Sequence, residues 1–387
     1  MLFRSVSSFK GLNFFPNLTS LYALHNKLTE FDGSGNPKLI SIDVDGNQIT
    51  NLNVRSNGAL QSLVCSNNNL TQLNISSNSR LRFLFCWQNP LGSLNVSGNR
   101  NLEIIDCRNN GLTELNIQNN SQLRTLSCSN NKITELNTSG NPKLRELYCW
   151  DNPIGAIDVS RNTNLEIFDC RETGIRELNL SNNKALKSLS CQNNALKELD
   201  LSGCPLLHEV YCENQQATGL TYKLTAEGYE INLKDLVSKP DNIDVTSLTE
   251  NNGFLRYDGV KKTVLFNYRP QSLYYRYNTH SPKNHMMSVV VKFSMNTAVI
   301  ERNGPIQNII YGLNDKNYLN YNGNALTEGS ISGYSDRQYG MKGFAADGNS
   351  RLIVRVQTNR PGKVAFSFKD DIGATLEKLT DRTKITA

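Results

Sequence analysis

Residues 81–101 read LRFLFCWQNPLGSLNVSGNRN, and residues 102–122, LEIIDCRNNGLTELNIQNNSQ, repeat the same pattern. Self-similarity at a short fixed period is the signature of a solenoid in which each unit forms one coil. The unit is L-x-x-L-x-C-x-x-N-x-L-x-x-L-N-L-S-x-N-x-x, and we number its ten copies coils 1 to 10. The first leucine of the unit recurs every 21 residues without insertion or deletion, at Leu18, Leu39, Leu60, Leu81, Leu102, Leu123, Leu144, Leu165, Leu186 and Leu207.

This leucine spacing predicts a mainly β fold, a right-handed leucine-rich repeat solenoid. The segment around the fourth and sixth positions alternates with period two, which indicates a short strand with leucine and cysteine pointing inward. Successive coils would place these strands in parallel, about 4.8 Å apart, on the concave face. Because 21 residues leave little room for a full helix, we expect extended or 3₁₀ structure on the return side.

Two columns of polar residues run through the repeat. An amide both donates and accepts hydrogen bonds, so stacked copies can satisfy backbone groups at the bends between coils. We therefore expect a structural role. The first column is Asn26, Asn47, Asn68, Asn89, Asn110, Asn131, Asn152, Thr173, Asn194 and Gln215, and the second is Asn36, Asn57, Asn78, Asn99, Asn120, Asn141, Asn162, Asn183 and Cys204.

Eight of the nine cysteines form one column, whose place is held by Ala23 and Val44 in coils 1 and 2. Interchange with small apolar residues favours a buried thiol. Zinc sites would need close C-x-x-C pairs, which are absent, and in-register parallel strands suit disulfides poorly. We expect a structural ladder of reduced, buried thiols at Cys65, Cys86, Cys107, Cys128, Cys149, Cys170, Cys191 and Cys212.

This cysteine column and the 21-residue period resemble the cysteine-bearing branch of the internalin-like leucine-rich repeat proteins of bacterial surfaces. The resemblance covers residues 18–217. It implies an extracellular or surface-displayed protein whose curved repeat face binds a partner, with the following β-domains acting as spacers or caps.

The side chains beside the inward leucine and cysteine should point outward. Their pattern has a longer period of three coils, because residues 81–143 and 144–206 align without a gap as aromatic, Asp/Arg and small. The fold does not require this pattern, and Trp, Tyr and Arg are enriched at binding hot spots. We predict a partner-binding face comprising Phe83, Phe85, Trp87, Asp106, Arg108, Tyr148, Trp150, Asp169, Arg171 and Tyr211.

Other interpretations of this face stay open. Block duplication could have copied a neutral surface, and the Asp/Arg stripes could be cross-strand pairs worth about 0.2–1 kcal/mol each. Stacked aromatics with Asp and Arg could also bind glycans. The chain could be the recognition part of a larger enzyme, although it carries no common catalytic motif and only four histidines.

The remaining sequence gives a domain plan. Residues 1–17 form an incomplete N-terminal segment, since residues 1–5 read like a translated sequencing adapter, and 18–221 form the solenoid. Residues 222–296 alternate as in a small antiparallel β-module that caps the last coil. Residues 297–387 predict an immunoglobulin-like β-sandwich that is cut short, with strands at 351–356 and 363–368 and an adhesin-like phrase at 346–350.

Composition narrows the function further. The net charge of +6 is not gathered in a basic cluster, which argues against nucleic acid as a partner, and no run of about 18 apolar residues is present. We expect a monomer that binds a protein or peptide, without cofactor, metal or catalysis.

Overall fold

The computed structural model describes residues 6–225, 228–249, 255–266, 270 and 272–300, together with strands at 309–311, 319–321, 362–364, 367–369, 375–378 and 383–385. The chain divides into two compact units. The first contains Met1–Ala217, Val237–Leu248 and Tyr274–Val290, and the second contains Thr218–Leu236, Thr249–Leu273 and Val291–Ala387.

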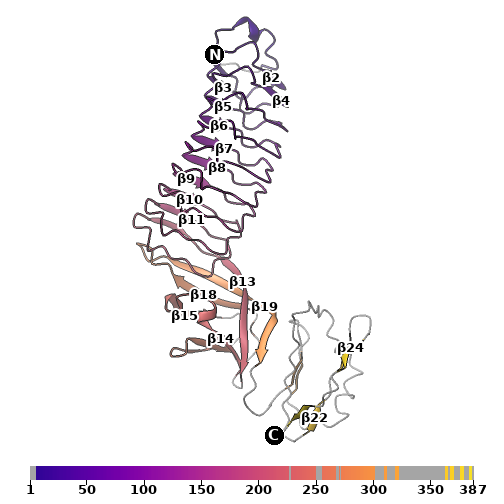
Figure 1. The fold of residues 1–387 in the computed structure, drawn as a ribbon, viewed down its shortest axis with the longest axis vertical. Coiled ribbons are helices and arrows are strands. Elements are labelled where there is room, and N and C mark those ends of the chain that lie inside the picture. The colour runs from indigo at the N-terminus through magenta and orange to yellow at the C-terminus, as the bar shows by residue number, and fades with distance from the viewer. Residues whose placement is uncertain are drawn as a thin grey trace. The chain divides into compact units, whose positions relative to one another are not determined.

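The repeat region forms one ten-stranded parallel sheet in which each coil contributes one three-residue strand. Neighbouring strands pair with an offset of one coil, as in Phe83 opposite Ile104. Figure 1 shows the strands stacked coil upon coil. In sheet order they are β1 (Ser20–Tyr22), β3 (Ser41–Asp43), β5 (Ser62–Val64), β6 (Phe83–Phe85), β7 (Ile104–Asp106), β8 (Thr125–Ser127), β9 (Glu146–Tyr148), β10 (Ile167–Asp169), β11 (Ser188–Ser190) and β12 (Glu209–Tyr211).

The return side of the coils is irregular. Only coils 1 and 2 form a second parallel pair there, β2 (Glu30–Asp32) with β4 (Asn51–Asn53). Helical structure among the described residues is limited to the 3₁₀ turns η1 (Leu12–Phe14), η2 (Leu233–Asp235) and η3 (Pro240–Asn242). None of these described helices has the length and apolar character needed to cross a membrane. The predicted mainly β solenoid with further β-structure after it is confirmed.

The core lies between the sheet and the return side. The middle residue of each strand is buried, and Leu63, Leu84 and Leu126 have no exposed surface. Full burial of one such side chain stabilises the fold by about 1.5–3 kcal/mol. Because each coil buries its leucines against its neighbours, the core is continuous through the stack.

The cysteines also lie in this core. All nine are free and buried, so the predicted column of reduced thiols is confirmed. Burial raises the pKa of the Cys65 and Cys212 thiols to about 12. The thiolate is the reactive form of cysteine, and these thiols therefore stay protonated and inert at neutral pH.

The asparagine columns bind backbone groups, as the sequence predicts. In the first column, Asn89 Nδ2 donates to the carbonyl oxygens of Cys65 (3.0 Å) and Cys86 (3.1 Å), and its Oδ1 accepts from Leu70 N at 3.0 Å. In the second column, Asn99 Nδ2 donates to carbonyls of the preceding coil at 2.9–3.0 Å. Each amide thus joins two coils through groups that water cannot reach.

The chain turns sharply after each strand. The eighth residue of nine coils has a positive φ of 52–58° although none of the nine is glycine, and Gly46 takes this place in coil 2. The left-handed region is unfavourable for most residues with a side chain. The next residue belongs to the first polar column, where an amide, or the Thr173 hydroxyl in coil 8, donates to the carbonyl oxygen three residues before it, as in Asn89 to Cys86.

The N-terminal residues pack on coil 1. Asn36 Nδ2 donates to the carbonyl oxygens of Leu12 (2.9 Å) and Phe15 (2.8 Å), and Phe9 meets Phe31 edge to face with ring centroids 6.3 Å apart. The second asparagine column therefore continues beyond the sheet and secures the η1 turn.

Two later segments of the first unit pack on coil 9. The buried Tyr275 hydroxyl donates to the Lys197 carbonyl at 2.7 Å, and Leu201 N donates to the Thr279 carbonyl at 2.7 Å. Lys239 Nζ lies 2.7 Å from Asp200 Oδ2. In the sheet order, β18 (Ser272–Asn278) lies between β15 (Ile243–Thr249) and β19 (Met286–Ile300).

The second unit contains an antiparallel arrangement. β14 (Gly228–Asn232) pairs with β13 (Gln215–Thr225) and with β17 (Thr263–Phe266), which pairs with β16 (Leu255–Asp258) across a turn at residues 259–262. The later short strands are β20 (Ile309–Tyr311), β21 (Leu319–Tyr321), β22 (Gly362–Val364), β23 (Ser367–Lys369), β24 (Thr375–Lys378) and β25 (Thr383–Ile385). The predicted strand at 351–356 and the adhesin-like phrase at 346–350 lie outside the described residues.

Candidate functional site

The ten-stranded sheet presents one surface made of the outward side chains at positions two, three, five and seven of the coils, which we call the sheet face. All of the predicted partner-binding residues lie on it. They come from the strands or from the second residue after a strand: Phe83, Phe85 and Trp87 in coil 4, Asp106 and Arg108 in coil 5, Tyr148 and Trp150 in coil 7, Asp169 and Arg171 in coil 8, and Tyr211 in coil 10.

Coils 4 and 5 bring three of these side chains into one cluster. Arg108 binds Asp106 through two hydrogen bonds, Nε to Oδ1 at 2.8 Å and Nη2 to Oδ2 at 2.6 Å. The same guanidinium lies over the indole of Trp87 in the preceding coil, with Cζ 5.8 Å from the ring centroid. The arginine therefore joins an ion pair to a cation–π contact.

Coils 7 and 8 repeat the cluster. Arg171 Cζ lies 4.7 Å from the centroid of the Trp150 ring, and Arg171 Nη2 lies 3.3 Å from Asp169 Oδ2. We call the two groups, Trp87–Arg108–Asp106 and Trp150–Arg171–Asp169, the triads. Since the strands pair in register, equivalent atoms of the two triads are three strand spacings apart, about 14 Å.

The Asp/Arg pairs differ from the expected cross-strand pairs. Both form within one coil, because positions five and seven of a strand project on the same side. The carboxylates are also less accessible than expected for partner-binding groups, since Asp106 is 7% and Asp169 is 8% exposed. The surface of each triad is therefore made by the indole and the guanidinium, with the carboxylate beneath them.

Burial governs the electrostatics of the triads. Burial raises the pKa of Asp169 above its ordinary value, and the Arg171 charge opposes this shift without cancelling it. The hydrogen bond to Asp106 raises the pKa of Arg108, so that guanidinium stays charged. Burial removes water from the carboxylate, and the neighbouring arginine supplies the favourable interaction that the water would otherwise provide.

The aromatic side chains of the face are graded in exposure. Phe83, Phe85, Trp87, Tyr148 and Trp150 are half-buried. Tyr22 and Tyr211, in coils 1 and 10, are 41% and 52% exposed. The four aromatics at position five, Tyr22, Phe85, Tyr148 and Tyr211, thus recur every three coils, and the two at the ends of the sheet protrude most.

Small residues stand beside the indoles. Ser66 and Ser129 occupy position seven in the coils before Trp87 and Trp150, and both are completely buried. They hold outward positions of the coil, yet their neighbours leave no part of them exposed. A serine leaves room for a large ring on the adjacent strand, so the order small-then-Trp is part of the triad geometry.

One charged column was missed by the sequence argument. In coils 4–6 and again in coils 7–9, position two is basic, acidic and basic in turn. These charges pair between neighbouring coils. Arg82 Nη2 lies 2.7 Å from Glu103 Oε1, and Arg145 Nη1 lies 3.6 Å from Glu166 Oε1. Comparison of residues 81–143 with 144–206 at position two would have found it, because the column has the same three-coil period: Arg82, Glu103, Arg124, then Arg145, Glu166, Lys187.

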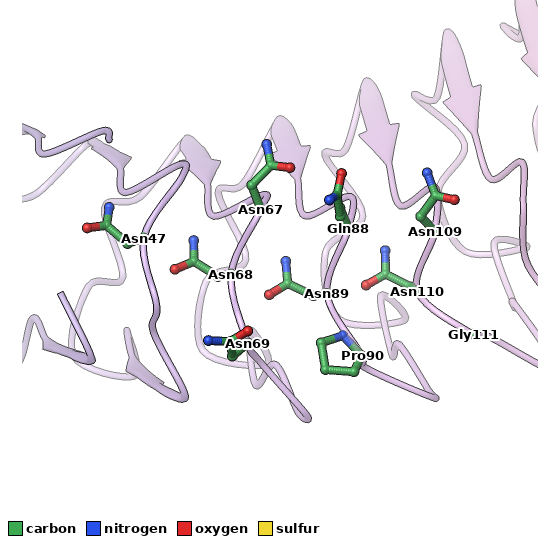
Figure 2. A pocket seen from close by; sticks show the side chains of 10 residues that line it. All are labelled: Asn47, Asn67, Asn68, Asn69, Gln88, Asn89, Pro90, Asn109, Asn110 and Gly111. Atoms are coloured by element: carbon green, nitrogen blue, oxygen red, sulfur yellow. The ribbon is translucent and has the colours of Figure 1, made fainter. Parts of the chain in front are cut away.

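Beside the ends of strands β3 and β5 to β7 lies a shallow hollow of about 620 Å³. Figure 2 shows three rows of side chains, with Asn67, Gln88 and Asn109 nearest to the strands and the stacked amides of the first column behind them. The amides behind are engaged with the backbone, as for Asn89. The lining residues are Asn47, Asn67, Asn68, Asn69, Gln88, Asn89, Pro90, Asn109, Asn110 and Gly111.

Within the described part of the chain, no group of three or more His, Cys, Asp or Glu side chains is placed to hold a metal ion. The His285 ring lies beside the Ser281 hydroxyl, with 3.0 Å between Nδ1 and Oγ. The chemistry that the sheet face offers is apolar contact with aromatic rings, bordered by paired charges.

Comparisons with known proteins find leucine-rich repeats in this chain. A family model described as leucine-rich repeats (two copies) matches residues 121–162. A search of curated proteins finds no match. Among solved structures, a leucine-rich repeat protein from Leptospira interrogans matches with 18% identity and a TM-score of 0.50, over 54% of this chain and 58% of that one.

Two Listeria monocytogenes structures also match. The functional domain of InlJ, which includes a cysteine ladder, has 25% identity and a TM-score of 0.45, over 74% of this chain and 83% of that one. The internalin InlF has 19% identity and a TM-score of 0.48, over 56% and 73%. The chain is similar to these internalin-type leucine-rich repeat proteins.

Proposed function

We propose that this chain is a non-catalytic binding protein, exported to or displayed on the surface of a bacterium, that recognises a protein or peptide through the sheet face. Leucine-rich repeat proteins of the internalin type are generally protein-binding. In this proposal the protein acts as a monomer, and the triads and Tyr211 make the contacts with the partner.

The observation that carries the proposal is the duplicated triad. The solenoid needs only its inward leucines, cysteines and asparagines, yet two identical outward groups recur three coils apart. Each presents an indole beside a position-five aromatic, Phe85 or Tyr148. Large, rigid aromatic side chains with arginine are the residues that dominate binding energy in protein interfaces.

The proposal is tested with a display library of random peptides selected on the immobilised chain. Peptides bound to the sheet face should lose at least tenfold in affinity on Trp87→Ala with Trp150→Ala, since each removes a hot-spot aromatic. A matched control replaces two exposed residues of the return side, Glu135→Gln with Glu177→Gln. Selection of peptides that bind the double tryptophan variant as well as the wild type would refute the sheet face as the site.

A glycan is the second candidate, favoured by the amide-lined hollow of Figure 2. Primary amides both donate and accept, which suits sugar hydroxyls. A glycan array probed with the chain separates the two ideas. Saccharide binding that is lost on Gln88→Ala with Asn109→Ala, and kept on Trp87→Ala with Trp150→Ala, would favour the hollow over the triads.

A further inference from the structure

The distance between the two triads sets the spacing that two contacting side chains of a partner would need. Trp87, Arg108 and Asp106 have their counterparts 63 residues later, and the strands between them pair in register without a bulge. Three strand spacings give about 14 Å between equivalent atoms. An extended peptide rises about 3.4 Å per residue, so four residues also span about 14 Å.

A separation of four residues also places both side chains on the same side of an extended peptide. Side chains of an extended chain alternate between its two sides, so residues i and i+4 project to the same side, whereas i+3 and i+5 do not. A peptide lying along the stacking direction of the coils, across the strands, would present two such side chains to the two triads. Its register would be set by the repeat itself.

The triads also specify the kind of side chain. The Asp106 and Asp169 carboxylates are buried and bound to their own arginines, and Nε and Nη2 of Arg108 are already donating. Beside its paired guanidinium, each triad offers an indole next to Phe85 or Tyr148, and the indole and this second ring are both half-buried. Apolar area with charges already compensated suits a large apolar side chain rather than a charged one.

The two ends of this surface differ in charge. Coils 7 and 8 carry the carboxylates Glu146, Asp151 and Glu172 at places where coils 4 and 5 have Phe83, Gln88 and Asn109. Asp151 and Glu172 are exposed at the ends of their strands. A peptide with basic residues at one end would therefore bind in one direction, with that end over coils 7 and 8.

We propose, resting on the function above, that the partner is an extended segment with large apolar side chains at positions i and i+4, flanked by lysine or arginine on the side that lies over coils 7 and 8. Each triad takes one of the two apolar side chains. The two contacts reinforce each other because binding of the first raises the effective concentration of the second.

The test uses the peptide library selected on the wild-type chain, with each enriched clone measured on Trp87→Ala and on Trp150→Ala separately. The result expected is a consensus of two large apolar residues four apart, with each single variant losing at least tenfold in affinity. Clones that depend on a tryptophan but have a single anchor residue, or anchors at another spacing, would refute the i and i+4 spacing without refuting the sheet face as the binding site. Absence of tryptophan-dependent clones overturns both.

The direction is tested with Asp151→Asn and Glu172→Gln combined, against the return-side control Glu135→Gln with Glu177→Gln. The first pair should weaken the consensus peptide severalfold at low salt and leave a peptide with its basic residues replaced by serine unaffected. The control pair should change neither. Equal loss with both pairs would show that overall charge, rather than a basic end over coils 7 and 8, governs binding.

Discussion

Coils 1–3 and coils 4–9 have similar interiors, apart from Ala23 and Val44 in the place of cysteine, and different exteriors. Leu63 and Leu126 are equally buried, whereas the places of Trp87 and Arg108 are held by Leu24 and Asp45 in the first block. Coils 1–3 therefore show what the solenoid needs in order to stack. What coils 4–9 add, the triads, is not needed for stacking, and this difference is the reason to assign the triads to binding.

The shared interior predicts the largest effects. Leu63→Ala and Leu126→Ala should each lower the free energy of unfolding by about 2–5 kcal/mol, because each removes a fully buried side chain and leaves a cavity. Urea denaturation followed by circular dichroism measures both. A loss in coil 3 much smaller than that in coil 6 would contradict the view that the blocks share one core.

The outward side chains of coils 4–9 and coils 1–3 should differ in their contribution to peptide binding. Trp150→Ala should weaken a peptide selected on the sheet face at least tenfold, about 1.4 kcal/mol or more. Leu24→Ala, at the equivalent position of coil 1, should leave the affinity unchanged. Isothermal titration measures both, and thermal melting of the variants checks that they fold. Similar losses with the two variants would remove the distinction between the blocks.

The comparison can be sharpened by grafting. Leu24→Trp with Asp45→Arg would build a third triad with Asp43 in coils 1 and 2. Burial and the Asp45 charge raise the pKa of Asp43 in the folded chain. Replacing the neighbouring carboxylate by a guanidinium should lower that pKa, as measured by carbon-13 NMR of the carboxyl group. An unchanged or higher pKa would show that the arginine does not reach Asp43.

The same graft has a pH signature. A carboxyl group whose folded pKa is raised contributes stability that is complete below its unfolded pKa and is lost as the pH rises through the folded pKa. The graft should reduce this loss, so the variant should gain stability relative to the wild type at pH 7 compared with pH 3.5. Denaturation at the two pH values tests this, and a relative gain at the lower pH would contradict it.

The smallest effect belongs to the charged column at position two. Lys187→Gln breaks the exposed pair with Glu166, in which Nζ and Oε2 are 2.5 Å apart. Such pairs contribute about 0–1 kcal/mol, and less at high salt. Denaturation at 0.01 M and 1 M salt measures the loss. A loss above that range at both salt concentrations would show that the column supports the fold rather than bordering the site.

The fold was predictable because its determinants are periodic. Leucine and cysteine spacing indicates the strands, and Asn89 and Asn99 bind the backbone groups that their columns predict. The left-handed turn at position eight was not foreseen, although Asn holds this place in five coils and Asn, Asp and His adopt positive φ more readily than other residues with a side chain. Gln88 and Glu172 lack this preference, and they adopt the same conformation because the coils stack in register, which is a tertiary effect.

The residues that lie on the candidate site could be predicted from the sequence, but the contacts between their side chains could not. Sequence period placed Trp87 and Arg108 on one surface, but the choice of Asp106 in the same coil as the ion-pair partner depends on side-chain packing. The complete burial of Ser66 could not be predicted from alternation, because it depends on how the side chains of neighbouring coils pack. The C-terminal strands pair over long sequence distances, as in β14 with β17, so local alternation could not give their order.

Intrinsic fluorescence offers the most direct measurement, since Trp87 and Trp150 are the only tryptophans in the chain. A tryptophan-free peptide selected on the sheet face should change the indole emission and protect it from iodide quenching. The single variants Trp87→Phe and Trp150→Phe should each retain part of the signal. Saturating peptide binding, confirmed by calorimetry, with no change in emission or quenching at either indole would contradict the account.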